Sequence, residues 1–325
     1  MKIYKFKIIS YKLLLVFFAY NSSFITHLSF AQQDPQYSQY MFNQLVINPA
    51  YAGSKDAVST VIDLRKQWVA MPGSPQTGTI SMHGILLNSL GIGGHLIMES
   101  IGPTKWTAAY IDASYRLRLG RGKLNLGVSG GLVNYNINVS ELNYKESGEP
   151  MLNYSGPRNA FDVNAGFYYY NQSFYLGGSV THISSPNLYN GTTTVYIQNT
   201  PKNASLFFSL QPHAFLYAGK GFQLNNDLIF NPSVMVKAVT SGAIPQVDVN
   251  LNFLLKSRIW LGVSARMGYG FVALAQVFVT DKFKVGYAFD QGINRIGLQG
   301  QSSHEVILSY DFNVFKSKML SPRYL

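Results

Sequence analysis

The chain has 325 residues, of which 13% are charged, 14% are aromatic and none is cysteine. The lack of cysteine excludes a disulfide framework and a thiolate metal site. The formal net charge is +11, but lysine and arginine form no cluster, so the composition gives no support for nucleic-acid binding.

Residues 1–31 read as an export signal that is absent from the mature chain. Four lysines, the last at Lys12, precede the apolar run Leu13–Tyr20, and the small residues Ser29 and Ala31 suit cleavage before Gln32. The alternative is a membrane anchor, but the apolar run is shorter than the ~20 residues that cross a bilayer. Cleavage leaves 22 basic and 15 acidic residues, a net charge of +7.

Residues 32–56 form a polar segment with unusual aromatic content. The stretch Gln33–Gly53 has four aromatic residues, two prolines and one charge. It is too polar to span a membrane and too irregular for an amphipathic helix. Asn48-Pro49 is a turn signal. We expect a periplasmic strap or plug that packs in a barrel mouth or on a partner; the alternative is a simple spacer.

A period of two dominates residues 57–313. In residues 246–256 the apolar side chains share one face and the polar ones the other: Val247, Val249, Leu251, Phe253 and Leu255 against Asp248, Asn250, Asn252 and Lys256. After the leader no apolar run reaches 18 residues, so no transmembrane helix is expected. Long alternating strands with few charges predict an all-β fold, an antiparallel transmembrane β-barrel of the outer-membrane type.

We predict fourteen strands in a single domain, followed by a periplasmic tail at 314–325. The strands are expected near 57–67, 77–87, 90–101, 105–119, 122–137, 159–170, 174–184, 205–218, 222–238, 246–256, 258–268, 270–280, 283–290 and 303–313. Every second connection is short, near Asn88, Arg121, Gln172, Lys220, Ser257 and Lys282, whereas most of the others are longer. Because outer-membrane barrels have short periplasmic turns, both termini are expected in the periplasm.

Several charged residues fall on the inward face of this alternation. They are Asp63, Arg65, Asp112, Arg116, Arg118, Asp162, Asp248, Lys256, Arg266, Lys284, Asp290 and Asp311. One interpretation is a solvated lumen with ion pairs between strands, in which Asn250→Arg would be tolerated. The other is a lumen surface that holds a plug or a partner. Glycines inside strands, such as Gly91 and Gly127, would allow lumen contents to approach closely.

No residue set points to catalysis. Gly127–Gly131 matches G-x-S-x-G, but it lies inside an alternating strand with no helix after it, so a nucleophile elbow is not expected. The five histidines after the leader show no metal-ligand spacing. We therefore predict no enzyme, no cofactor and no metal site.

The stretch Asp34–Gly53 resembles the N-terminal signature of the PorP/SprF family of type IX secretion and gliding-motility membrane proteins. Arg65–Trp68, Pro72–Leu86, Gly91–Thr104, Val285–Asp290 and Ser302–Phe312 resemble further parts of that family. One position departs from it: Gln44 stands where the family usually has proline or a similar residue. The resemblance implies an outer-membrane barrel of the Bacteroidota that supports export, or surface attachment, of a cognate adhesin-like protein.

Two functions therefore remain open. An export or attachment barrel would have a plugged or partner-occupied lumen, with lipid around it and a type IX component or adhesin as partner. A diffusion channel or apolar-solute transporter would have an open lumen. An outer-membrane hydrolase is a distant third. The candidate plug- or partner-contacting residues are Tyr37, Tyr40, Met41, Phe42, Asn48, Pro49 and Tyr51.

Overall fold

The computed structural model describes residues 34–55, 57–141, 158–197, 200–240, 242–294, 297–299 and 301–312. Residues 1–31, expected to be the leader, and the tail at 314–325 lie outside this set. Residues Gln33–Leu325 form one compact unit. No helix within the described ranges is both long and apolar enough to cross a membrane.

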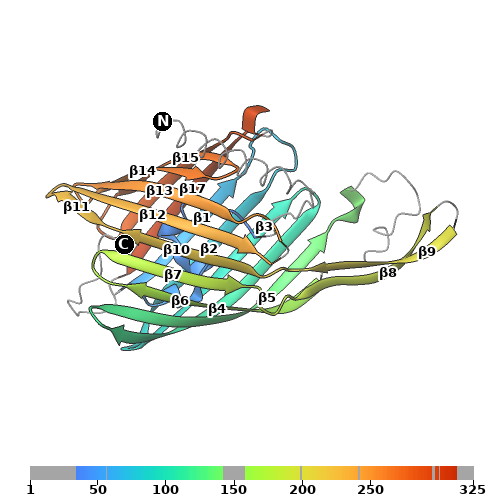
Figure 1. Cartoon of the computed structure of the whole chain (residues 1–325), viewed down its shortest axis with the longest axis horizontal. Coiled ribbons are helices and arrows are strands. Elements are labelled where there is room, and N and C mark those ends of the chain that lie inside the picture. The colour runs from blue at the N-terminus through green and yellow to red at the C-terminus, as the bar shows by residue number, and fades with distance from the viewer. Residues whose placement is uncertain are drawn as a thin grey trace, which may run out of the picture. The chain divides into compact units, whose positions relative to one another are not determined.

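Fourteen antiparallel strands close into a barrel, which confirms the predicted fold class (Figure 1). The closing pair joins the first strand to the last, from Val58 opposite Phe312 to Lys66 opposite His304. The segments of the wall are β1 Val58–Lys66, β2 Gln76–Leu87, β3 Leu90–Ile101, β4 Thr104–Leu119, β5 Gly122–Ile137, β6 Arg158–Tyr170, β7 Phe174–Thr181, β10 His213–Lys220, β11 Phe222–Asn225, β12 Leu228–Val239, β13 Gln246–Leu255, β14 Ile259–Arg266, β15 Gly270–Phe278, β16 Phe283–Gly292 and β17 Ser302–Phe312.

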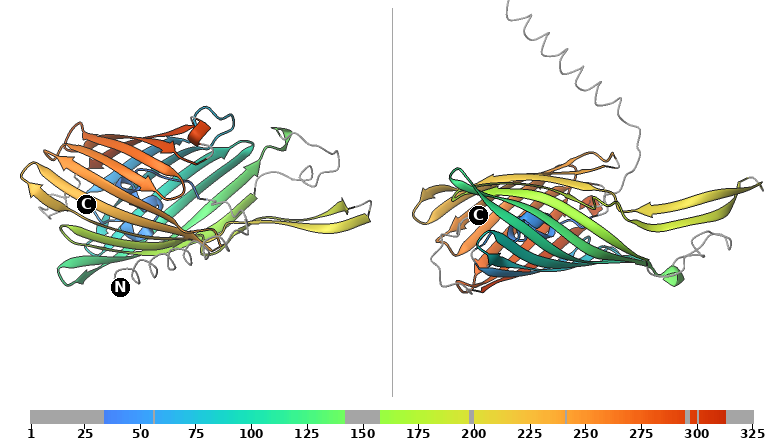
Figure 2. Two further views of the ribbon diagram at one scale, coloured as in Figure 1. Left: turned by 45° about the horizontal axis from the view of Figure 1, so that its top comes forward. Right: turned by 90° about the horizontal axis from the view of Figure 1, so that it is seen from below.

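The two ends of the barrel differ. At the end where β1 starts and β17 stops, called here the turn end, every connection between strands is a short turn. At the opposite end, called the loop end, several connections are long, and one contains the hairpin of β8 (Asn187–Ile197) and β9 (Thr200–Ser209). This hairpin extends beyond the barrel wall (Figures 1 and 2).

The strand expected at 205–218 is wrong in its first part. Residues up to Ser209 belong to β9, which pairs with β8 in a separate two-stranded sheet, and the barrel strand β10 begins at His213. Pro212 lies at the break, and proline has no N–H to donate to a ladder. The alternation ran through this break because it carries no information about which neighbour a strand pairs with.

The strand expected at 222–238 is also wrong, because the chain turns at Asn226–Asp227. β10 and β11 share one register against β12, with Gly219 opposite Ser233 and Phe222 opposite Phe230, so they form one strand interrupted at Gly221. The short turn predicted near Lys220 therefore lies at Asn226–Asp227. There the Asp227 amide donates to the side chain of Asn225 at 2.9 Å, a local bond typical of turns.

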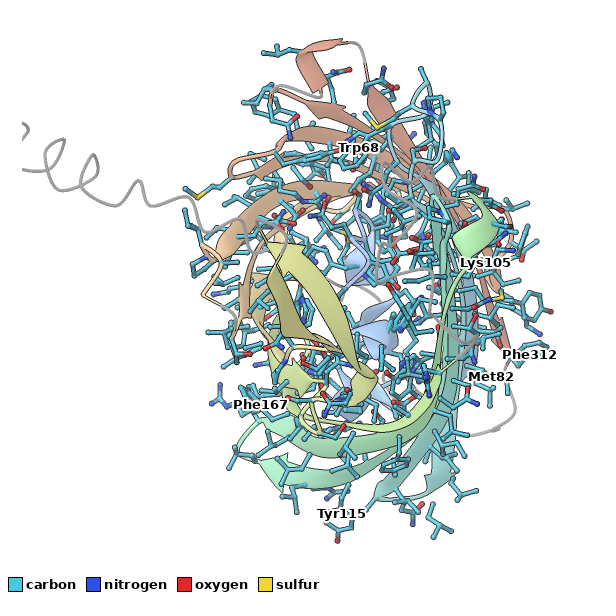
Figure 3. All side chains as sticks on the ribbon, turned by 90° about the vertical axis from the view of Figure 1, so that its right-hand side faces the viewer. Trp68, Met82, Lys105, Tyr115, Phe167 and Phe312 are labelled. Atoms are coloured by element: carbon cyan, nitrogen blue, oxygen red, sulfur yellow. The ribbon has the colours of Figure 1, made fainter. Side chains whose placement is uncertain are left out.

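The outer face of the wall is apolar over its middle. Ile111 is 71% exposed and Leu251 40% exposed, while their neighbours Asp112 and Asn250 are buried inside. Figure 3 shows Met82, Tyr115 and Phe312 directed away from the barrel. An apolar outer band on a closed barrel fits a hydrocarbon surround, because closure leaves no unpaired strand edge in lipid.

Leu251→Arg should therefore reduce the stability of the membrane-inserted barrel. An arginine on the lipid face near the bilayer centre costs roughly 2–4 kcal/mol. The measurement is unfolding in urea after reconstitution into lipid vesicles. Ile244→Arg is the control, because Ile244 is 89% exposed in the connection between β12 and β13. Equal stabilities of the two variants would contradict the assignment of this outer face.

Candidate functional site

Residues 34–54, called here the plug, run through the barrel lumen. They contain three short 3-10 turns, η1 Tyr40–Phe42, η2 Gln44–Val46 and η3 Pro49–Tyr51. Figure 3 looks along the barrel and shows these turns inside the ring of strands. Most plug residues are buried, including Gln39 and Asn48 at 0% exposed. The plug is therefore part of the core of this barrel.

The last 3-10 turn follows directly from its sequence. Asn48 is its N-cap, and the Asn48 side chain accepts a hydrogen bond from the Ala50 amide at 2.9 Å. Pro49 occupies the first position, where a missing N–H costs nothing. The turn signal at Asn48-Pro49 thus fixes the local conformation of the plug near the turn end.

Asp34 lies at the loop end in a cluster of buried polar groups. Its carboxylate contacts His182 Nε2 at 2.7 Å and accepts a hydrogen bond from the Thr181 hydroxyl at 3.1 Å. His182 Nδ1 lies 2.7 Å from a carboxylate oxygen of Asp162. One imidazole therefore stands between two carboxylates, one on the plug and one on the wall.

The pKa values of this cluster follow from its geometry. Burial by itself would lower the pKa of His182, but the carboxylates of Asp34 and Asp162 raise it to about 10. Burial would likewise raise the pKa of Asp34, but the charge of His182 holds it well below its usual range. At neutral pH the imidazole of His182 is therefore protonated and the carboxylate of Asp34 is ionised. This ion pair ties the start of the plug to the wall.

The centre of the plug is held through its backbone. The amides of Ser38 and Gln39 donate to the two carboxylate oxygens of Glu305, at 2.8 and 2.7 Å. Arg65 contacts Glu305 at 2.9 Å and Asp290 at 2.6 Å, and these three side chains are fully buried. Because removing one member of a buried ion pair leaves an uncompensated charge, this arrangement depends on all its members.

Tyr40 connects the plug to the opposite part of the wall. Its hydroxyl accepts a hydrogen bond from the side chain of Asn250 at 2.6 Å, and Asn250 also bonds Ser233 and Ser264. Asn250 is 1% exposed. The expectation that Asn250→Arg would be tolerated is therefore wrong, since no room or solvent is available at this inward position.

The plug ends against a cluster of tyrosines. The side-chain Nδ2 of Asn48 donates to the Phe167 carbonyl at 2.9 Å and to the Tyr217 hydroxyl at 3.0 Å. Tyr51 packs edge-on against Tyr168, with ring centroids 5.2 Å apart. Beyond it, Arg116 donates to the carbonyl of Gly53. These contacts place the end of the plug at the turn end.

Two strand glycines allow this close packing. A Cβ on Gly127 would lie 2.3 Å from the backbone nitrogen of Ala50, and one on Gly91 would lie 2.3 Å from the carbonyl oxygen of Ala52. Both contacts are with backbone atoms, which cannot rotate away. The sequence-based interpretation of strand glycines as points of close approach describes these two positions.

The residues proposed as plug or partner contacts lie inside the barrel. Six of them are buried: Tyr37, Tyr40, Met41, Asn48, Pro49 and Tyr51. Phe42 is half-buried, and its ring centroid lies 6.2 Å from that of Trp260. The structure places them against the wall and leaves none of them free to contact an external protein. Of the two forms expected for this segment, a strap or a plug, the described residues form a plug, which runs the length of the lumen instead of packing only at a mouth.

Most of the predicted inward charges lie in the lumen, where most of them bond to other groups instead of forming a solvated surface; Asp63 is buried with no hydrogen-bond partner among the described residues. Buried or half-buried in the lumen are Asp63, Arg65, Asp112, Arg116, Asp162, Asp248, Arg266, Lys284, Asp290 and Asp311. Pairs between strands include Arg266 with Asp248 at 3.0 Å and Lys284 with Asp311 at 2.7 Å.

Two predicted positions differ. Lys256 is wrong as a lumen residue: it is exposed in the turn after β13, with a positive φ of 46°, because the strand ends at Leu255. Arg118 keeps the inward parity of β4, but it is exposed at the turn end of that strand.

Sequence reasoning missed three residues that hold the plug. Glu305 was on the inward face of its strand, so parity could have found it. Asp34 stands in the family signature, but nothing in its surroundings indicates a charged partner. His182 follows the end of β7, where the alternation stops and no period applies.

Gly127→Ala should loosen the plug. The added methyl group would displace the Ala50 backbone, and overpacking of this kind costs roughly 1–3 kcal/mol. We expect conductance in planar bilayers where the parent protein shows little. Gly130→Ala is the matched control in the same strand, because its Cβ would meet only the outer atoms of the Phe161 ring at 3.3 Å. An unchanged conductance in Gly127→Ala would argue against steric closure at this point.

The Asp34 cluster should weaken at high pH. Because the pKa of His182 is raised to about 10, its contribution is complete below the ordinary histidine value and is lost as pH rises through about 10. Because the pKa of Asp34 is lowered, its contribution is lost only in strong acid. Conductance should therefore rise between pH 8 and pH 11.

His182→Gln is the reference variant for this step, since glutamine does not titrate. Its conductance should change less between pH 8 and pH 11 than that of the parent protein. Identical pH responses in the two proteins would assign the change to other titrating groups.

The chain was compared with curated protein sequences and with solved structures. No curated protein sequence matches the chain significantly. Among solved structures, a TodX mutant described as a monoaromatic hydrocarbon channel is 11% identical, with a TM-score of 0.50 over 83% of this chain and 94% of that one. The toluene transporter TbuX of Ralstonia pickettii is 9% identical, with a TM-score of 0.49 over 82% of this chain and 93% of that one. At 11% identity the likeness to the TodX mutant concerns the fold alone.

The family comparison is more specific. Residues 29–310 match the family described as type IX secretion system membrane protein PorP/SprF. The match begins before the plug and extends through most of β17. It therefore includes both the plug and the wall that contacts it. The chain therefore belongs to the PorP/SprF family of type IX secretion system membrane proteins.

Proposed function

We propose that this outer-membrane barrel supports export or surface attachment of one cognate adhesin-like protein that leaves the cell by the type IX route. In this proposal residues 1–31 are removed on export, the turn end faces the periplasm and the loop end faces outward. Short periplasmic turns and longer outer loops are the usual arrangement of such barrels.

The observation that carries the proposal is the filled lumen in a member of a secretion family. The plug passes from Asp34 at one end to Gly53 at the other, and the wall contacts it along this whole path. A diffusion channel needs a continuous open path, and an apolar-solute transporter needs an apolar one. Here ion pairs and hydrogen bonds occupy the middle of the lumen.

The filled lumen also bears on where a partner binds. The plug aromatics are buried, so an exported protein would meet the outside of the molecule. At the loop end the β8–β9 hairpin extends beyond the wall, and among the described residues its two strands form a separate two-stranded sheet (Figure 2). We therefore place the contact with the exported protein at the loop end.

A deletion of the gene should remove one large protein from the cell surface. Proteins on intact cells are labelled with a membrane-impermeant biotin reagent and compared before and after deletion. Re-expression of the parent chain should restore the lost protein. Arg258→Ala is the control variant, because its ion pair with Asp281 at 3.2 Å is exposed at the turn end. An unchanged set of surface proteins in the deletion strain would contradict the proposal.

The purified protein separates this function from its alternative. We expect little steady conductance from the partner-free barrel in planar bilayers at neutral pH, because the plug stays in place. Steady, solute-selective conductance in the parent protein would instead favour a diffusion channel or transporter.

A further inference from the structure

The direction of the plug has a topological consequence. The Asp34 side chain contacts Thr181, the last residue of β7. Lys237, near the end of β12, donates to the backbone carbonyl oxygen of Asp34 at 3.4 Å. Both strands finish at the loop end. The plug therefore begins at the mouth that also carries the β8–β9 hairpin.

The other end of the plug lies across the barrel. Ser114 donates to the carbonyl of Ala52 at 2.7 Å, and the Gly53 amide donates to His83 at 3.2 Å. Gly53 also approaches Gly91 near the start of β3, at the turn end. From there β1 begins at Val58, opposite Phe312. The chain thus crosses the barrel once as the plug before it enters the wall.

The contacts along this path fix its direction. The Ser38 and Gln39 amides bond Glu305, Asn43 accepts from Ser81 at 2.7 Å, and Asn48 bonds Tyr217. Residues before Asp34 are joined to the plug at the loop end. Cleavage before Gln32 leaves two residues ahead of Asp34, and two residues span at most about 7 Å, too short to reach back to the turn end.

We propose that the amino-terminal end of the mature chain is displayed at the outer surface of the cell, at the same mouth as the β8–β9 hairpin. In that position an exported polypeptide can meet it from outside. This inference rests on the orientation in the proposed function, in which the loop end faces outward. It differs from the sequence-based expectation that both termini lie in the periplasm.

Because the chain has no cysteine, each single cysteine variant carries one thiol that can be labelled and then read on the purified protein. A short epitope is placed directly before Asp34 in the full-length precursor. Two single variants mark the ends of the barrel: Ile244→Cys at the loop end, where the residue is 89% exposed, and Asp281→Cys at the turn end, where the side chain is 89% exposed. Each of these chains is expressed in a strain from which the native gene has been deleted. Folding is checked by the heat-dependent shift of the barrel on a gel.

On intact cells we expect antibody binding to the epitope and labelling of Ile244→Cys by an impermeant maleimide. Asp281→Cys should be labelled at least tenfold more after the outer membrane is permeabilised. An epitope that is reached only after permeabilisation, while Ile244→Cys is labelled on intact cells, would overturn the display of the amino terminus and leave the proposed function intact. Labelling of Asp281→Cys alone on intact cells would overturn the orientation, and with it both proposals.

A tagged chain that does not fold is replaced by Gln33→Cys, which changes only the residue directly before the plug and leaves the Asp34 cluster in place. A small impermeant thiol reagent should modify this cysteine on intact cells, as it does Ile244→Cys. Modification of Gln33→Cys only after permeabilisation, where Ile244→Cys reacts on intact cells, would also overturn the display of the amino terminus.

Discussion

The carboxylate of Glu305 joins the plug to the wall, and much of the lumen depends on it. Its two oxygens accept the amides of Ser38 and Gln39, and one of them also contacts Arg65. A backbone amide buried without a partner costs about as much as a lost hydrogen bond, and a buried charge without a partner costs more. Plug and wall therefore satisfy one another: the plug supplies donors to a buried acid, and the wall supplies acceptors to a segment without regular structure.

This mutual dependence explains the composition of the inner face. A plug of irregular backbone presents N–H and C=O groups in many directions, so the wall needs polar side chains at particular points, such as Asn250 opposite Tyr40 and Ser114 opposite Ala52. At Gly91 and Gly127 the plug backbone packs directly against the strand backbone, and a side chain there would overlap it. Buried charged residues of the lumen, such as Arg65 with Asp290 and Arg266 with Asp248, form pairs that bridge strands or hold the plug.

A closed lumen also limits what a secretion-family barrel of this size does by itself. The path through the wall is occupied by the protein's own segment, so a second polypeptide does not share it while the plug is in place. The regions available to another protein are the lipid-facing surface and the two ends. Of these, the loop end has the longer connections and the projecting hairpin, and it is also where the plug begins.

The sequence by itself determined the barrel class, the number of strands and the inward or outward parity of most residues, because a period of two depends on local backbone geometry alone. It also marked the plug through its aromatic content and its turn at Asn48-Pro49. Pairing partners are a different matter: the break before His213 and the turn at Asn226–Asp227 follow from which strand lies alongside, and alternation is the same on either side of such a break. The tertiary structure alone decided that the plug runs the whole lumen and that Asp34, His182 and Asp162 meet, because these groups are far apart in the chain and come together only when the barrel closes.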